Sequence, residues 1–285
     1  MASLKEIKSR ISSVNSTMKI TSAMKMVASA KLRKAQKNSE AFIPYQKKLE
    51  EMLQSFLLSE DNFTTSFAEQ RDLKKVAVII LSSNSSLCGA FNSNVIKELD
   101  KTLIEYKKLG DDNILLFPIG KKVYDFCRKK GYNVQDINSL IDSPKYTPTI
   151  EFANMLMNLF VEKKVDRIEL IYQHCKSTST QQLLHQCFLP MSLDIENVSK
   201  ESTDYLVEPN KTLIVKDLLP KVLRLKIYAA LLDSYAAEQA ARTVAMQVAT
   251  DNANELLQEL TIQYNKSRQQ AITNELLDII GGSQF

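Results

Sequence analysis

The feature that most constrains this chain is the absence of glycine and proline from residues 221–280. A continuous helix over that stretch would be about 90 Å long at ~1.5 Å per residue, several times the length of an ordinary globular helix. Residues 1–43 also contain neither residue type. The sequence therefore predicts a long helix at each end of the chain.

Both stretches carry a single apolar stripe. Its members step by three and four residues, which is the spacing of a coiled-coil seam. They are Leu4, Ile7, Ile11, Val14 and Met18 at one end, and Met246, Ala249, Ala253, Leu256 and Leu260 at the other. We therefore expect the two helices to pair as a long antiparallel coiled coil, with alanines between 236 and 253 allowing close approach.

The middle of the chain alternates short apolar runs with helical patterns. Strands are expected at 76–81 (VAVIIL), 114–120 and 166–172, with a short one near Val134 and a possible edge strand at 181–190, ended by Pro190. Helices are expected over about 92–108, 121–130 and 150–163. This order predicts an α/β fold with a Rossmann-like, mostly parallel sheet covered by helices.

These patterns divide the chain into three parts. We expect an N-terminal coiled-coil helix over 1–70, a central α/β domain over 75–208 and a C-terminal coiled-coil helix over 210–285. The α/β domain is thus inserted between two helices that meet outside it.

Residues 1–40 are strongly basic. They hold nine Lys or Arg residues against Glu6 and Glu40, a local net charge of +7, although the whole chain carries only +4. A basic segment on a near-neutral body indicates an acidic partner, which could be nucleic acid, anionic lipid or acidic protein. A solvated helix face is the plainer alternative.

The sequence offers little sign of export or membrane insertion. The four cysteines have no CxxC spacing, the amino terminus has no apolar signal region, and no run reaches the ~18 apolar residues of a membrane span. We expect a reducing compartment, with attachment to a membrane only through partners.

Two clusters invite a chemical interpretation. The loop SSNSSLCGAFN at 82–92 follows a strand, where phosphate is often bound, but its single Gly89 satisfies neither phosphate-loop pattern. A Ser/Asn cap with a buried Cys88 is favoured instead. A zinc site is the other possibility, but its spacing fits no known finger and favours ordinary hairpin residues. The candidate ligands are His174, Cys175, His185 and Cys187.

Neither catalysis nor nucleic-acid binding finds support. There is no GxSxG and no paired carboxylate pattern, so no catalytic site is expected in this chain alone. No aromatic residue lies between Met1 and Ala41 to stack on bases, so nucleic acid is not an expected partner. No metal or cofactor is expected.

The ends of the chain resemble a known family. "KEIKSRISSVNSTMKITSAMKMVASAKLRKAQ" at 5–36 and "AAEQAARTVAMQVATDNANELLQELTIQYNKSRQQAITNELLDIIGG" at 236–282 closely resemble the gamma subunits of rotary F-type ATP synthases. The carboxy-terminal signature of that family is matched by Ile272, Thr273, Glu275, Asp278 and Gly281. The resemblance covers essentially the whole chain, and the middle matches in the order of its elements more than in its amino acids.

The resemblance implies a rotor subunit without an active site of its own. The coiled coil would stand inside a ring of alpha and beta subunits, and the α/β body would sit with the epsilon subunit on the membrane ring of c subunits. Proton flow through the membrane would turn the rotor and drive ATP synthesis at beta, and hydrolysis would reverse the rotation. The expected location is the cytoplasmic face of a bacterial inner membrane, because no presequence is apparent.

The resemblance also assigns roles by position. The expected contacts with beta are Met24, Lys25, Lys31, Arg33, Arg242, Arg268 and Gln269. The expected shaft tip is Leu276 to Ile280, with Leu276, Ile279 and Ile280 as its apolar members, and the expected residues near the c ring and epsilon are Tyr205 and Glu208.

One departure from the family lies in the central loop. Family members usually carry Asp-Arg-Gly where this chain has Asn84, Ser85 and Ser86, so no role of that charged loop is carried over. The alternative to a rotor is a nucleotide-binding α/β protein with basic coiled-coil arms, and the missing phosphate-loop glycines count against it.

Overall fold

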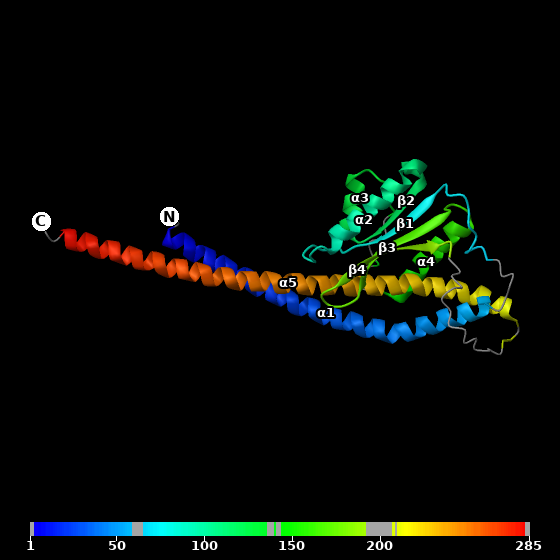
Figure 1. Cartoon of the computed structure of the whole chain (residues 1–285), viewed down its shortest axis with the longest axis horizontal. Coiled ribbons are helices and arrows are strands. Elements are labelled where there is room, and N and C mark those ends of the chain that lie inside the picture. The colour runs from blue at the N-terminus through cyan, green and yellow to red at the C-terminus, as the bar shows by residue number, and fades with distance from the viewer. Residues whose placement is uncertain are drawn as a thin grey trace. The chain divides into compact units, whose positions relative to one another are not determined.

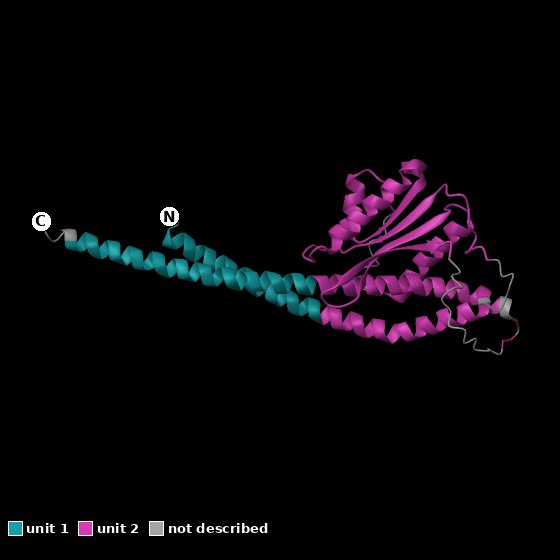
Figure 2. Ribbon diagram, viewed as in Figure 1, with its two compact units in different colours: residues 1–29, 242–285 teal, residues 30–241 magenta. Residues whose placement is uncertain are grey.

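The computed structural model describes residues 3–58, 65–135, 140, 144–191, 207–208 and 210–282. The chain forms two compact units, one of residues 1–29 with 242–285 and one of residues 30–241 (Figure 2). Each unit contains part of both long helices, α1 (Leu4–Leu58) and α5 (Lys211–Gly282). The prediction of a long helix at each end of the chain is confirmed.

Each long helix contains a proline that bounds a breaker-free stretch of the sequence, and both prolines lie inside the helices expected over 1–70 and 210–285. Pro44 lies inside α1 and Pro220 lies inside α5. A proline within a helix removes one backbone hydrogen bond and costs about 3 kcal/mol, so packing nearby must offset that loss. In α5 the leucines directly before Pro220, Leu218 and Leu219, are buried in the main core.

In the first unit, α1 and α5 lie side by side and antiparallel (Figure 1). The hydroxyls of Thr21 and Thr250 are 2.9 Å apart, and Lys25 Nζ donates to Gln247 Oε1 at 2.7 Å. Ile7 and Leu260 of the predicted seam are buried. The expected antiparallel pairing is therefore observed in this unit.

The second unit is built on a four-stranded sheet, formed by β1 (Val76–Leu81), β2 (Ile114–Ile119), β3 (Arg167–Cys175) and β4 (Gln181–Leu189). The strand order is β2-β1-β3-β4; β1 is parallel to β2 and β3, whereas β4 is antiparallel to β3. The mostly parallel sheet and the edge position of β4 agree with the prediction. Val134 forms an isolated parallel bridge with Leu116 rather than a strand.

Helices cover both faces of the sheet (Figure 1). On one face, α2 (Phe91–Tyr106) and α3 (Lys121–Lys129) pack on Val76, Val78 and Ile80. Two short 3-10 helices, Lys107–Leu109 and Asp111–Asn113, lead from α2 into β2. On the other face, α4 (Tyr146–Val161) and parts of α1 and α5 pack on the intervening residues of β1. This alternation of β1 residues between two cores is the period of two expected of a strand buried on both faces.

The start of α4 differs from the sequence-based prediction. The helix begins at Tyr146 rather than near 150 and contains Pro148 in its first turn. The first four N–H groups of a helix have no acceptor within it, so a proline there sacrifices no hydrogen bond.

Candidate functional site

The first place to look for a ligand in such a sheet is the switch point of the strand order. Parallel α/β sheets bind ligands beyond the carboxyl ends of the strands, where the order reverses. Because β1 lies between β2 and β3, that point lies between the carboxyl ends of β1 and β3. The loop 82–90, which follows β1, and Cys175, which ends β3, border it.

The N–H groups that could bind phosphate on the neighbouring helix α3 already have acceptors within the chain. Lys121 N–H donates to Asn84 Oδ1 at 2.9 Å, Lys122 N–H to the Ser83 carbonyl at 3.2 Å, and Val123 N–H to Ser82 Oγ at 3.2 Å. The same loop is braced by Asn92, whose amide donates to Ser83 Oγ at 2.8 Å. The loop therefore caps α3 instead of cradling a phosphate.

This corrects one sequence-based expectation. The Ser/Asn loop was expected to cap the helix that follows it, α2, but the cap position there is Ala90 and makes no side-chain cap bond. The loop's polar groups are used by α3 and by each other instead. Cys88 is buried, as expected.

The chain's own helix α5 fills the switch point. Ala237 and Ala241 of α5 pack against Cys88 and Phe91 in one buried cluster. Beneath them, the side-chain amide of Gln173 donates to the Phe91 carbonyl at 2.5 Å. A nucleotide would have to displace this helix, so the crevice cannot act as a ligand site in this conformation.

The four candidate zinc ligands each have another partner. His174 Nδ1 lies 2.5 Å from Asp233 Oδ2 on α5, and His185 Nε2 lies 2.8 Å from Glu169 Oε2. The thiol of Cys175 donates to the Ser177 carbonyl at 3.7 Å. The thiol of Cys187 donates to the Pro190 carbonyl at 3.5 Å. Across the described residues, no group of three His, Cys, Asp or Glu side chains is placed to hold a metal ion. The geometry gives the zinc interpretation no support.

A buried carboxylate, Glu169 of β3, organises a polar network between the sheet and α2. It accepts hydrogen bonds from Tyr106 and His185 and forms an ion pair with Arg167 Nε at 3.0 Å. The other ring nitrogen of His185 lies 3.6 Å from Glu98 Oε1. The network thus ties β3, β4 and α2 together.

The network lowers the pKa of Glu169 and raises the pKa of His185. Burial by itself would raise the pKa of Glu169, but the hydrogen bonds from His185 and Tyr106 and the charge of Arg167 outweigh it and lower the pKa. The hydrogen bond to Glu169 raises the pKa of His185, against the effect of burial. The contribution of His185 to stability is fully present below pH ~6.5, its pKa in the unfolded chain, and is lost as pH rises through its raised pKa in the folded chain. The contribution of Glu169 is lost in the opposite direction, as pH falls through its lowered pKa in the folded chain.

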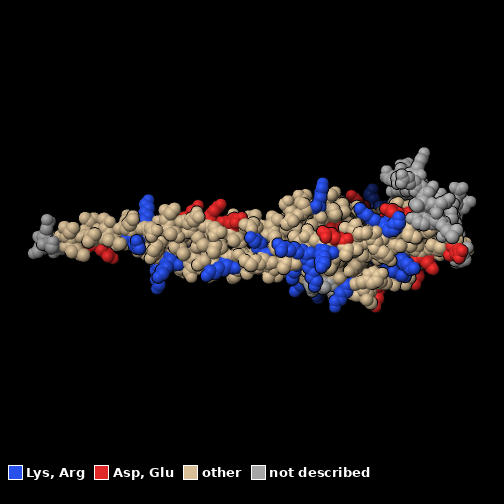
Figure 3. Space-filling view, turned by 90° about the horizontal axis from the view of Figure 1, so that it is seen from below, with Lys and Arg blue, Asp and Glu red and all other residues tan. Residues whose placement is uncertain are grey.

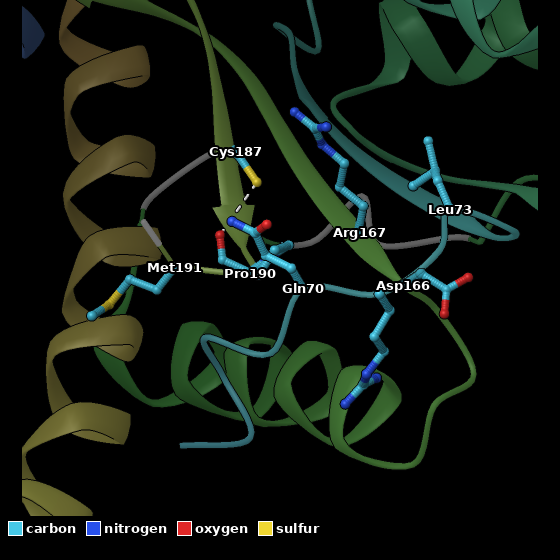
Figure 4. A pocket seen from close by; sticks show the side chains of 8 residues that line it. Gln70, Leu73, Asp166, Arg167, Cys187, Pro190 and Met191 are labelled. Atoms are coloured by element: carbon cyan, nitrogen blue, oxygen red, sulfur yellow. Dashed lines mark hydrogen bonds between the residues drawn. The ribbon is translucent and has the colours of Figure 1, made fainter. Parts of the chain in front are cut away.

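A small pocket of about 330 Å³ lies where segment 70–73 meets the start of β3 and the end of β4 (Figure 4). Its charged groups serve the fold: Arg71 donates to the Phe160 carbonyl at 2.9 Å, and Asp166 accepts the N–H groups of Lys74 and Lys75. Burial raises the pKa of the Cys187 thiol, which disfavours the nucleophilic thiolate. The eight lining residues therefore form no catalytic arrangement.

The expected contact residues of α1 are displayed to different degrees. Lys31 and Arg33 are exposed, whereas Met24 is half-buried and Lys25 is half-buried against Gln247 of α5. Figure 3 shows lysines and arginines scattered over the visible face of the long helices. The sequence identified these cations, but not that one of them bonds across the helix pair.

The expected contact residues of α5 also divide. Arg268 and Gln269 are exposed, but Arg242 is only 8% exposed and presents little surface to a partner. The apolar residues near the end of α5 are fully displayed: Leu276 is 55%, Ile279 68% and Ile280 60% exposed. Glu208 is exposed, and Tyr205 lies outside the described residues.

Sequence reasoning missed a set of apolar side chains that face away from the seam of the first unit. Ile20, Met26 and Val27 of α1 and Val248 and Ile262 of α5 are each more than half exposed. Exposed apolar side chains that gather on one surface favour an interaction site there. The signal was present in the sequence, because these residues fall outside the three-and-four stepping of the seam.

Among the described helices, none has a stretch long and apolar enough to cross a lipid bilayer.

Comparison with known proteins gives one consistent result. A family model described as ATP synthase matches residues 3–284. The ATP synthase gamma chain of Bacteroides fragilis strain ATCC 25285 is 54% identical over 288 residues, covering 99% of each chain, and that of Phocaeicola vulgatus is 50% identical with the same coverage. In structure, the chain resembles one from the rotor of the Euglena gracilis mitochondrial ATP synthase, with a TM-score of 0.63 and 21% identity over 94% of this chain and 98% of that one.

Proposed function

The chain belongs to the ATP synthase gamma chain family, and from this premise we propose that it is the central-stalk rotor of a bacterial proton-translocating ATP synthase. In this role residues 1–70 and 210–285 supply the shaft and residues 75–208 the body. The shaft turns inside a ring of alpha and beta subunits, and the body rests with the epsilon subunit on the c ring. Proton flow turns the c ring and the body, and the shaft passes that rotation to the catalytic beta sites.

One observation carries the proposal most strongly. The paired helices of the first unit display apolar side chains such as Met26 and Ile262 on their outer surface, where no other described part of that unit covers them. Large exposed apolar surfaces are enriched at interaction sites, so these side chains support a role in which a partner covers the helix pair. A ring of subunits around the helix pair would do so.

Two observations on the described residues support a role for this chain without chemistry of its own. The switch point of the sheet is filled by Ala237 and Ala241 of α5, and the described pocket lacks an activated nucleophile. ATP synthesis and hydrolysis are therefore assigned to beta. The filled crevice also disfavours the alternative of a nucleotide-binding α/β protein with basic arms.

The surface residues then take specific roles. Contacts with beta are assigned to Met24, Lys25, Lys31, Arg33, Arg268 and Gln269, and to the small exposed part of Arg242. Leu276, Ile279 and Ile280 form the tip that turns in an apolar sleeve, and Tyr205 and Glu208 face epsilon and the c ring. These contacts hold the chain at the cytoplasmic face of the inner membrane.

Co-purification tests the proposal. An affinity tag on the full chain, expressed in a bacterium that supplies its own ATP synthase, is expected to recover alpha, beta and epsilon subunits together with ATPase activity. The purified chain alone is expected to hydrolyse no ATP. Recovery of the tagged chain without alpha and beta subunits would contradict the proposal.

A further inference from the structure

The packing of α5 changes as the helix passes along the sheet of the second unit. Up to Leu231 its large side chains are embedded in the main core between the sheet, α4 and α1. From residue 236 to 241 the apolar contacts are made by alanines: Ala236 and Ala240 pack with Leu32 and Ala35 of α1, and Ala237 and Ala241 pack with Cys88 and Phe91. Glu238 and Gln239 of the same stretch are also buried. Methyl groups let helices approach closely but interlock weakly, so they resist rotation of α5 about its axis less than large side chains do.

A carboxylate clamp lies at the point where this change occurs. Asp233 of α5 accepts the backbone N–H of Cys175 at 2.9 Å through one oxygen and faces His174 Nδ1 at 2.5 Å with the other. Because a carboxylate only accepts hydrogen bonds, His174 carries a proton on Nδ1. Cys175 is the last residue of β3, so the clamp grips the sheet at the carboxyl end of a central strand.

The two hydrogen bonds from Asp233 to the adjacent residues His174 and Cys175 restrain α5 in two ways. They hold the position of α5 along its axis and its rotation about that axis, because either motion would break at least one of the bonds. The backbone N–H is itself fixed by the β3–β4 pairing, in which Cys175 lies opposite Gln181. The clamp is half-buried, with 23% of the Asp233 side chain exposed, which protects it partly from competing water.

We propose that Asp233 is a positioning residue that locks the rotation of α5 to the α/β body, so that torque passes between the body and the shaft without slippage at this level. The inference rests on the proposed rotor function for its consequence, but the clamp itself can be measured in the isolated chain.

The first test is amide hydrogen exchange of the full-length chain. Asp233→Ala removes both acceptors and is expected to speed exchange at Cys175 at least tenfold, with smaller effects elsewhere in the sheet. Asp217→Ala removes an exposed carboxylate from the same helix and is the matched control. Unchanged exchange at Cys175 in Asp233→Ala would show that the carboxylate does not hold the strand, and would overturn the proposal.

The second test uses the assembled ATP synthase in proteoliposomes, with ATP-driven proton uptake and ATP hydrolysis measured together. Asp233→Ala is expected to keep at least half of the hydrolysis rate while protons moved per ATP fall at least twofold against a steep gradient. Asp233→Asn keeps an oxygen acceptor for Cys175 N–H and is expected to restore most of the ratio, whereas Asp217→Ala should leave it unchanged.

The outcomes distinguish failure of the Asp233 clamp from failure of the rotor function. If the enzyme with the native chain pumps normally and Asp233→Ala leaves the number of protons moved per ATP unchanged, the clamp proposal is overturned and the rotor function stands. Equal losses of hydrolysis and pumping in Asp233→Ala would indicate a purely structural role and also overturn the proposal. Failure of the native chain to assemble with alpha and beta subunits would instead refute the rotor function.

Discussion

Gly120, between β2 and α3, is a position where the structure predicts a strong effect of adding one methyl group. Its φ is +109°, a region that residues with a side chain rarely adopt. A Cβ built there would lie 2.2 Å from the Ser82 carbonyl oxygen and 2.6 Å from Ser82 Oγ. Both contacts belong to the loop that closes the switch point of the sheet, so neither can yield without moving β1 or α3.

The expected cost of Gly120→Ala has two parts. Holding alanine at this φ costs roughly 1–3 kcal/mol, and forcing a methyl group into a close-packed site adds about 1–3 kcal/mol. We therefore expect the free energy of unfolding to fall by roughly 2–6 kcal/mol. For a unit of this size each kcal/mol lowers Tm by about 2–4 °C, which gives a fall of roughly 4–24 °C.

Gly131 provides the matched control, since its φ is +78° and a Cβ there would meet nothing within 4 Å. Gly131→Ala should therefore show the backbone cost alone, about 1 kcal/mol. Urea unfolding of both variants, followed by circular dichroism, measures the difference. If Gly120→Ala were no less stable than Gly131→Ala, the argument from close approach to Ser82 would be refuted.

Three further predictions concern charge and exposed surface. His185→Gln should lower stability by about 1 kcal/mol near pH 6 and abolish the loss of stability that the native chain shows as pH rises through the raised pKa of His185, measured by urea unfolding across pH; an unchanged pH profile would contradict the Glu169 network. Lys25→Ala with Arg33→Ala should lower stability by only about 1 kcal/mol, for the lost hydrogen bond from Lys25 to Gln247, but lower proton pumping per ATP in the assembled enzyme; normal pumping would show that these cations play no part in coupling. Ile279→Ser with Ile280→Ser should leave the unfolding of the isolated chain unchanged, because both side chains are exposed, yet reduce recovery of the assembled enzyme; normal recovery would argue against an apolar sleeve.

Much of the fold was predictable because its signals are local. The absence of breakers from 221–280 and the stepping of the seam indicate the long helices, and runs such as VAVIIL indicate buried strands. The expected helices over 1–70 and 210–285 already ran through Pro44 and Pro220, although the packing that offsets the local cost of each proline is visible only in the structure. The expected strand near Val134 was wrong, because its single bridge is too short a pairing to make a strand.

The candidate site was less predictable, because its decisive contacts join residues far apart in sequence. Nothing near the loop 82–92 indicates that Ala237 and Ala241, about 150 positions away, fill the crevice beside it. The apparent zinc ligands were misleading for the same reason, since Asp233 and Glu169, which engage the two histidines, belong to other elements. Exposure along α5, such as the burial of Arg242, likewise follows only from tertiary packing.

Direct observation of rotation tests the central claim most directly. A bead attached through Lys108→Cys, an exposed position after α2, would report the motion of the body while alpha and beta subunits are fixed to a surface and hydrolyse ATP. The account predicts continuous rotation of the bead in one direction, with three repeated pauses per turn that match the three beta sites. Steady ATP hydrolysis with a bead that does not turn would contradict it.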